Sequence, residues 1–172
     1  MALDADDLAP FERFPGDPLA GIALQRELEE RAFRLGGNSY AAPAQRLEDF
    51  LASRPSTRLG AIAASYQPGV HPADLAELLP APLIEALREA LPVFARRLKG
   101  YDHPDAVLTG VETRTSSPVR IPRDEAWEAL NVKGRVPAGE GAGYAGGILS
   151  AGIDGIRAAE ALAIQILRPK PV

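Results

Sequence analysis

The stretch that decides the fold is residues 139–148, which read Gly139-Glu140-Gly141-Ala142-Gly143-Tyr144-Ala145-Gly146-Gly147-Ile148. Five glycines fall within nine residues, and a helical pattern follows to Leu167. Glycine lets the backbone take positive φ and lets a ligand approach bare amides, while the following helix offers free N–H groups and the positive end of its dipole. The pattern suits an anion or an electron-rich ring edge. The alternative is a plain flexible turn, because glycine patterns give many false positives.

Short β-branched segments precede this loop and predict strands. They cover residues 106–109, 111–115 and 119–121, and a turn at residues 131–134 leads into a further expected strand at 135–138. So few strands make only a small sheet, which is marginally stable by itself.

Helical patterns dominate the first hundred residues. Asp17-Pro18 and the apolar stripe up to Leu35 predict an amphipathic helix over residues 18–35, after an extended lead-in over residues 1–16. Further helices are expected over residues 43–53, 72–79 and 84–98, with Pro92 kinking or dividing the last. Helices followed by strands, a glycine loop and a final helix favour an α+β fold over a repeating βαβ wind.

Composition excludes several classes of function. The net charge of −4 and pI near 5.3 argue against a nucleic-acid partner, which requires a basic face. The absence of cysteine excludes disulfides and thiolate metal sites, and two histidines, His71 and His103, without a ligand cluster predict no metal site. No apolar run approaches the roughly 20 residues that cross a bilayer, so no membrane association and cytoplasmic residence are expected.

A polar stretch before Pro118 supplies further candidates. Arg114 is the preferred anion-binding side chain, because a guanidinium grips a carboxylate in two places. Ser116 and Ser117 face substrate or flavin in one interpretation and form a hydroxyl-rich turn in the other. Tyr144 either covers a bound ring or anchors the loop, and Trp127 is interpreted as a core or interface anchor.

The last helix carries many small residues and therefore leaves room for a close neighbour. These residues are Ala151, Gly152, Gly155, Ala158, Ala159 and Ala161. Each interior glycine costs about 1 kcal/mol relative to alanine, which close approach of a cofactor or of a neighbouring backbone would offset. The sequence favours neither the cofactor nor the neighbouring backbone as the group that packs against this helix.

The sequence resembles a bacterial family of FAD-dependent dehydrogenases, or NAD(P)/FAD-dependent oxidoreductases, of undefined substrate. The resemblance is carried by residues 107–121, 137–150 and 154–160, and upstream by residues 17–22, 25–29, 42–46 and 65–74. In that family a nucleotide-binding βαβ unit with its own glycine fingerprint comes first, and no such unit is found here. The resemblance thus implies the carboxy-terminal portion of a flavoenzyme, cut or truncated before Met1.

The resemblance also assigns roles within the loop. Gly139 and Glu140 are expected at the ribityl and pyrophosphate region, while Gly141, Gly143, Gly146, Gly147 and Ile148 bring backbone near the flavin. Residues 1–103 are expected to form a helical substrate-side segment and residues 104–172 the last part of the FAD-binding domain. FAD, a small-molecule substrate and the missing dinucleotide-binding domain are the expected partners, and the chain alone is expected to be inactive.

Two alternatives stay open. The chain is either one part of an FAD-dependent oxidoreductase or a free-standing anion-binding, nucleotide-binding or assembly domain without catalysis. The helical segment either shapes a substrate pocket or serves self-association, and a homo-oligomer is one expected consequence of uncovered apolar surface.

Overall fold

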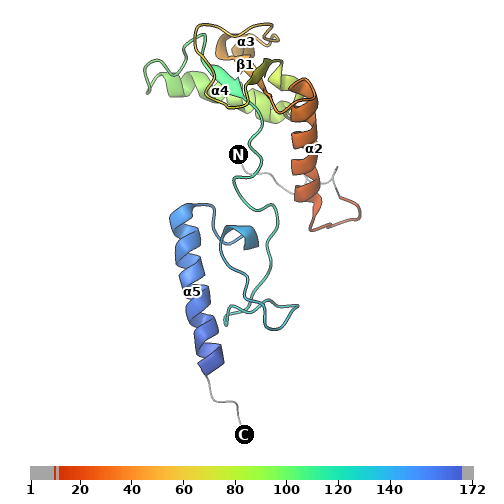
Figure 1. Ribbon diagram of the computed structural model, residues 1–172, viewed down its shortest axis with the longest axis vertical. Helices are drawn as coiled ribbons and strands as arrows, with labels where there is room; N and C mark the ends of the chain where they lie inside the picture. Colours follow the sequence, from red (N-terminus) through yellow and green to blue (C-terminus); the bar gives the residue numbers. More distant parts are fainter. Residues whose placement is uncertain (1–9, 11, 168–172) are drawn as a thin grey trace. The chain divides into compact units, whose positions relative to one another are not determined.

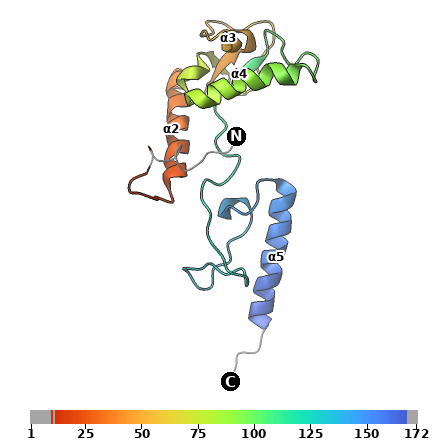
Figure 2. The same ribbon diagram turned by 180° about the vertical axis from the view of Figure 1, so that it is seen from behind.

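The computed structural model in Figures 1 and 2 describes residue 10 and residues 12–167. Much of the extended lead-in predicted over residues 1–16 lies outside these residues. The described chain has two compact units, Leu24–Thr113 in one and residues 12–23 with residues 114–167 in the other. We describe each by itself, as a first and a second unit. Helices and a small sheet confirm the predicted α+β fold.

The first unit is built on a three-stranded sheet in the order β2-β1-β3. Strand β1, Ala42–Arg46, pairs in parallel with β2, Val70–Pro72, and antiparallel with β3, Val107–Thr109. The predicted helix over residues 43–53 is therefore wrong, since only its second half, α3 at Leu47–Leu51, is helical. Both partners of β1 come from distant residues, and such pairing overrides local propensity. The strand expected at residues 106–109 is confirmed by β3.

Two longer helices contribute side chains to the core beside this sheet, and Figure 1 shows both. Helix α2, Ala20–Leu35, confirms the amphipathic helix expected over residues 18–35. Helix α4, Ala81–Ala95, includes Pro92 without being divided by it. Because Pro92 lies in the last turn, its missing N–H removes one hydrogen bond and leaves the rest of the helix intact.

The core of the first unit collects side chains from both helices and from the turns between the strands. It comprises Ala32, Leu47, Phe50, Leu75, Leu78, Ile84 and Leu91. The helix predicted over residues 72–79 is wrong: Pro72 ends β2 and a short 3-10 helix, η2, occupies Leu75–Glu77. Asp74 accepts a hydrogen bond from the Ala76 N–H at 3.0 Å and so begins that turn.

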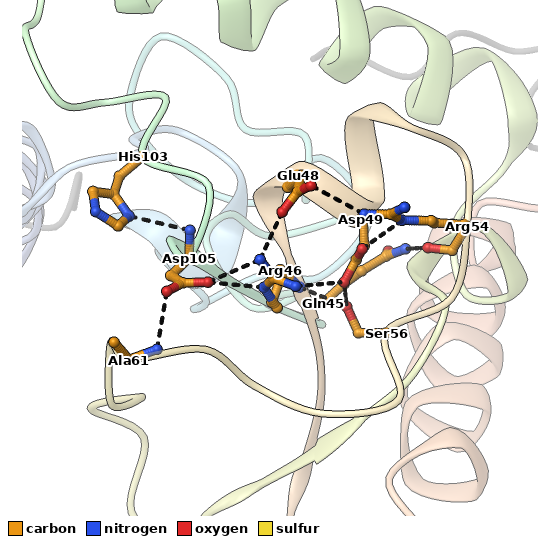
Figure 3. Close-up of polar contacts among 9 residues, drawn as sticks. All are labelled: Gln45, Arg46, Glu48, Asp49, Arg54, Ser56, Ala61, His103 and Asp105. Atoms are coloured by element: carbon orange, nitrogen blue, oxygen red, sulfur yellow. Dashed lines mark hydrogen bonds and ion pairs between the residues drawn. The ribbon is translucent and has the colours of Figure 1, made fainter.

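Gln45 is the buried polar centre of the first unit (Figure 3). Its side chain donates to the Arg54 carbonyl at 2.8 Å and accepts from the Leu75 N–H at 2.9 Å. Fully buried amides are stable only when hydrogen-bonded in this way. Gln45 therefore joins β1 to the loop after α3 and to η2.

Asp49 of α3 also holds the loop that follows this helix, as Figure 3 shows. Ser56 donates to Asp49 at 2.7 Å, and Arg54 pairs with the same carboxylate at 2.6 Å. Burial raises the pKa of Asp49, but these hydrogen bonds outweigh it and the pKa lies below its usual value. Arg46 pairs with Asp105 at 2.9 Å, and Asp105 accepts the Ala61 N–H at 3.0 Å.

The second unit has one long helix, α5 at Ile148–Leu167, and a short 3-10 helix, η3 at Glu140–Ala142. The helix expected from residue 147 to Leu167 is confirmed. The strands expected at residues 111–115, 119–121 and 135–138 are wrong, since an isolated bridge between Arg123 and Ala129 is the pairing found in this part of the described chain. A strand needs ladder partners, and the described segments around residues 119–138 do not supply them.

Within the described residues, the chain passes from one compact unit to the other after Ala23 and again after Thr113. The functional division predicted between residues 103 and 104 stays a prediction, because compactness does not show which residues face a substrate or a cofactor.

Candidate functional site

Arg123 and Asp154 form the central ion pair of the second unit. The guanidinium donates to both carboxylate oxygens, at 2.7 and 3.0 Å, and also to the Pro137 carbonyl at 2.8 Å. The two side chains are only 11% and 13% exposed. Bidentate, partly buried pairs of this kind specify geometry as well as adding stability. The pair joins α5 to the segment before the glycine loop.

Two aromatic rings enclose the same guanidinium. Its central carbon lies 3.7 Å from the Trp127 ring centroid and 3.6 Å from that of Tyr144. The Tyr144 hydroxyl donates to the Ile121 carbonyl and accepts the Arg123 N–H, both at 3.0 Å. Cations over aromatic faces are stabilised by the ring quadrupole. Tyr144 thus anchors the loop, which is one of its two predicted roles.

Asp154 also fixes the start of the glycine loop. Its carboxylate accepts the Gly139 N–H at 2.8 Å. The hydrogen bond from Arg123 is the largest influence on this group, and with the Gly139 bond it outweighs burial and holds the pKa of Asp154 below its usual value. The carboxylate is therefore charged at neutral pH, as the pair requires.

Gly139 and Gly143 are required by the backbone of the loop. They border η3 with φ of +69° and +80°. A Cβ on Gly143 would lie 2.6 Å from the Val119 carbonyl oxygen, so only glycine fits there. The loop is closed by the Tyr144 N–H, which donates to the Gly139 carbonyl at 3.1 Å.

The other loop glycines are required by neither conformation nor packing. A Cβ on Gly141 would meet open space, and one on Gly146 would lie 3.5 Å from the Ser116 hydroxyl, an ordinary contact. The same holds for Gly147, whose nearest neighbour would be the Ser150 hydroxyl at 3.5 Å. Bare backbone at these positions leaves space for another molecule.

An open pocket of about 310 Å³ lies at this part of the loop. It is lined by Ser116, Ser117, Gly143, Tyr144, Ala145 and Gly146. The structure thus brings two sequence-predicted groups together, the serines before Pro118 and the second half of the glycine loop. Even the lining residues of the two groups that are nearest in the sequence, Ser117 and Gly143, are 26 positions apart.

The two serines differ in what they do. Ser117 donates to the Val119 carbonyl at 2.8 Å and to the Gly141 carbonyl at 3.2 Å, so it closes the turn against the loop. Ser116 is exposed at the pocket, and its hydroxyl makes no hydrogen bond within the part of the chain that the structure describes. Ser116 therefore has its hydrogen-bonding capacity left for a ligand.

The remaining predicted site residues lie around the pocket without lining it. The Glu140 carboxylate is half-buried and has no hydrogen bond or ion pair among residues 12–167. Ile148, the first residue of α5, is 93% exposed. Arg114 is exposed and is not one of the lining residues.

A second hollow, of about 380 Å³, lies along α5 and is lined by Trp127, Arg157, Glu160 and Ile164 among others. None of the residues that the sequence predicted for the site lines it. We place the candidate site at the smaller pocket, because bare glycine backbone and an uncommitted hydroxyl converge there.

The residues that hold the loop in place carried no predicted role in the site. Trp127 was interpreted only as an anchor, and neither Arg123 nor Arg120 was considered, although Arg120 also lies 4.5 Å from the Tyr144 ring centroid. Asp154 was noted only as part of a resemblance. The available signal was two arginines and the tryptophan within residues 120–127, but the partner of Arg123 on α5 is 31 residues away.

The two histidines lie outside this site. His103 Nδ1 accepts the Asp105 N–H at 3.1 Å, and His71 is exposed next to Gly37. Among the residues described, no group of three or more potential ligands could hold a metal ion. No helix in the same residues is long and apolar enough to span a membrane.

Comparison with known proteins shows the family. The model of the family described as "FAD-dependent protein, C-terminal domain-like" matches residues 6–115. A relative from Clostridium beijerinckii (strain ATCC 51743 / NCIMB 8052), named only "Uncharacterized protein", is 48% identical over 160 residues, which are 92% of this chain and 30% of the relative. That match extends over the glycine loop, and the chain spans about a third of the relative's length. The chain therefore belongs to the family described as "FAD-dependent protein, C-terminal domain-like".

Proposed function

We propose that this chain supplies one part of the flavin site of an FAD-dependent oxidoreductase of the dehydrogenase type. The observation that carries the proposal is the pocket where Ser116 and Gly146 meet beside the start of α5. Family membership supports FAD as the cofactor of the intact protein. The substrate is a small organic molecule from which FAD takes a hydride or electrons.

The residues at the pocket fit part of this cofactor. Gly146 leaves open the space that a Cβ would fill, and the Ser116 hydroxyl can donate to, or accept from, a polar ring atom or a phosphate. The first N–H groups of α5 have no partner within the helix and favour negative charge. Glu140 could accept hydrogen bonds from ribityl hydroxyls, because its carboxylate makes none within the described residues.

The pocket fits a part of FAD and not the whole. Sites that enclose a drug-sized ligand measure about 300–1,000 Å³, and this pocket is open and at the lower end. The rest of the cofactor would be bound by another portion of the intact protein. The match to this chain covers only about a third of the relative, which leaves a large portion for that role. The chain alone is accordingly proposed to be inactive.

Within the intact enzyme FAD would supply the redox chemistry, and this chain would supply position and electrostatics. Arg123, Asp154 and Tyr144 hold the loop so that its backbone does not reorganise when the cofactor binds. Ser116 and the start of α5 would orient one edge of the cofactor and favour negative charge there.

The test is a titration with FAD, followed by flavin fluorescence, of the chain alone and of the chain co-expressed with the unmatched portion of the Clostridium relative. We expect retention of FAD only in the second preparation. Glu140→Ala and Ser116→Ala should each weaken it, and Ser65→Ala, at an exposed serine of the first unit, should not. Equal affinity in all four proteins would refute the proposed site.

A further inference from the structure

Helix α5 exposes an unusually large apolar surface. Apart from Ile164, which lines the larger hollow, six of its large aliphatic side chains are more than half exposed, namely Ile148, Leu149, Ile153, Ile156, Ile166 and Leu167. Ala158 is the one buried residue among those of α5 that the structure describes. Contiguous apolar patches of this kind on a protein surface mark interaction sites.

These side chains share one side of the helix. At 100° per residue, Ile148, Leu149, Ile156 and Leu167 fall within about 100° of one another, with Ile153 next to them. The opposite side faces the rest of the second unit, where Asp154 pairs with Arg123 and Gln165 donates to the Ala126 carbonyl. One half of α5 thus has its partners in this unit, and the other half has none among the described residues there.

Small residues lie in the middle of the exposed side. Gly152, Ala159 and Ala163 are all exposed, and a Cβ on Gly152 would meet nothing within 4 Å. The small side chains at these positions leave room for the backbone of a partner to approach closely. We call this surface, formed by Ile148, Leu149, Gly152, Ile153, Ile156, Ala159, Ala163, Ile166 and Leu167, the apolar face of α5.

We infer that the apolar face of α5 is the docking surface for the portion of the FAD-dependent protein that this chain does not match in its relative. The length of that portion favours it as occupant, since the match takes only 30% of the relative. Ile148 is also two residues from Gly146 of the pocket, so a partner that covers Ile148 would lie next to the pocket. This last step rests on the proposed function, whereas the docking itself does not.

The experiment uses single thiols, because the chain contains no cysteine. Ile156→Cys places a thiol in the apolar face, and Val93→Cys places a matched one on exposed α4 in the first unit, where Val93 is 47% exposed. Each variant is co-expressed with the unmatched portion of the Clostridium relative, and the relative's own matching segment serves as the positive control. The readouts are co-purification and the rate of modification by a maleimide, with and without the partner.

The expected result is a one-to-one complex in which the thiol at position 156 reacts at least tenfold more slowly than in the chain alone, while the thiol at position 93 is unchanged. Ile156→Glu should abolish co-purification without lowering the melting temperature of the chain alone. Equal reactivity at position 156 in the complex, or no complex where the relative's own segment forms one, would overturn the inference. Slow maleimide modification of the thiol at position 156 in the chain alone, compared with the thiol at position 93, would also overturn the inference. A second copy or the first unit would then be the occupant of the face.

Flavin content is measured separately in the same preparations. A complex that depends on Ile156 but retains no FAD would support the docking surface and refute the proposed function. A complex that retains FAD and is insensitive to Ile156→Glu would support the proposed function and refute the docking surface.

Discussion

The Asp154 carboxylate accepts both bonds of a bidentate pair with Arg123 and, through the same oxygen that Arg123 contacts at 3.0 Å, the N–H of Gly139. One side chain of α5 thereby sets both the position of the helix and the first residue of the glycine loop. The pair thereby holds the loop whose second half lines the pocket.

Asp154→Asn should destabilise the second unit by roughly 2–3 kcal/mol, because it leaves a largely buried guanidinium without its counter-charge. Trp127 is the only tryptophan and stacks on Arg123, so its fluorescence reports on this unit selectively. Urea unfolding followed at Trp127 is the measurement. Glu160→Gln, at an exposed carboxylate of the same helix, should change the free energy of unfolding by no more than about 0.5 kcal/mol.

The same pair predicts a pH dependence. The pKa of Asp154 is lowered in the folded state, so its stabilising contribution is complete above the unfolded pKa of about 3.9 and is lost as the pH falls through the folded value. The stability of the second unit should be constant between pH 7 and about 5 and fall below pH 4. Asp154→Asn should remove part of that fall, and an identical acid profile in the variant would contradict the assignment.

Two glycines of one loop should respond differently to the same methyl group. Gly143→Ala forces a positive φ on alanine and places its Cβ against the Val119 carbonyl oxygen, so we expect a loss of at least 1 kcal/mol. Gly141→Ala adds a Cβ in open space and should be nearly neutral. Trp127 fluorescence during unfolding distinguishes the two, and equal stabilities would show that η3 is misplaced.

In the first unit, Gln45→Ala should cost about 1–3 kcal/mol, because it leaves the buried Leu75 N–H without an acceptor. Hydrogen exchange at the Leu75 amide is the direct readout, and it should accelerate. Gln67→Ala, at an exposed glutamine, serves as the matched control. Unchanged exchange at Leu75 would mean that the Gln45 network is not formed.

Local pattern predicted the three long helices of the described chain, because apolar periodicity is a property of neighbouring residues. It failed at β1, where Ala42–Arg46 becomes a strand only through pairing with residues 70–72 and 107–109. It also overpredicted strands before the loop, since β-branched residues indicate a strand only where partners exist. The glycine loop and the serines were found from composition, but Arg123 and Asp154 meet across 31 residues and left no local pattern.

The central claim is that the pocket at Gly146 is part of a flavin site, and the FAD affinity of Gly146→Val in complex with the unmatched portion of the relative tests it most directly. Position 146 needs no positive φ and the added Cβ would lie 3.5 Å from the Ser116 hydroxyl, an ordinary contact, so we expect the fold to be retained, which Trp127 fluorescence would verify. We predict a loss of affinity of at least tenfold, or about 1.4 kcal/mol. Unchanged affinity in a folded Gly146→Val complex would contradict the claim and place the flavin elsewhere.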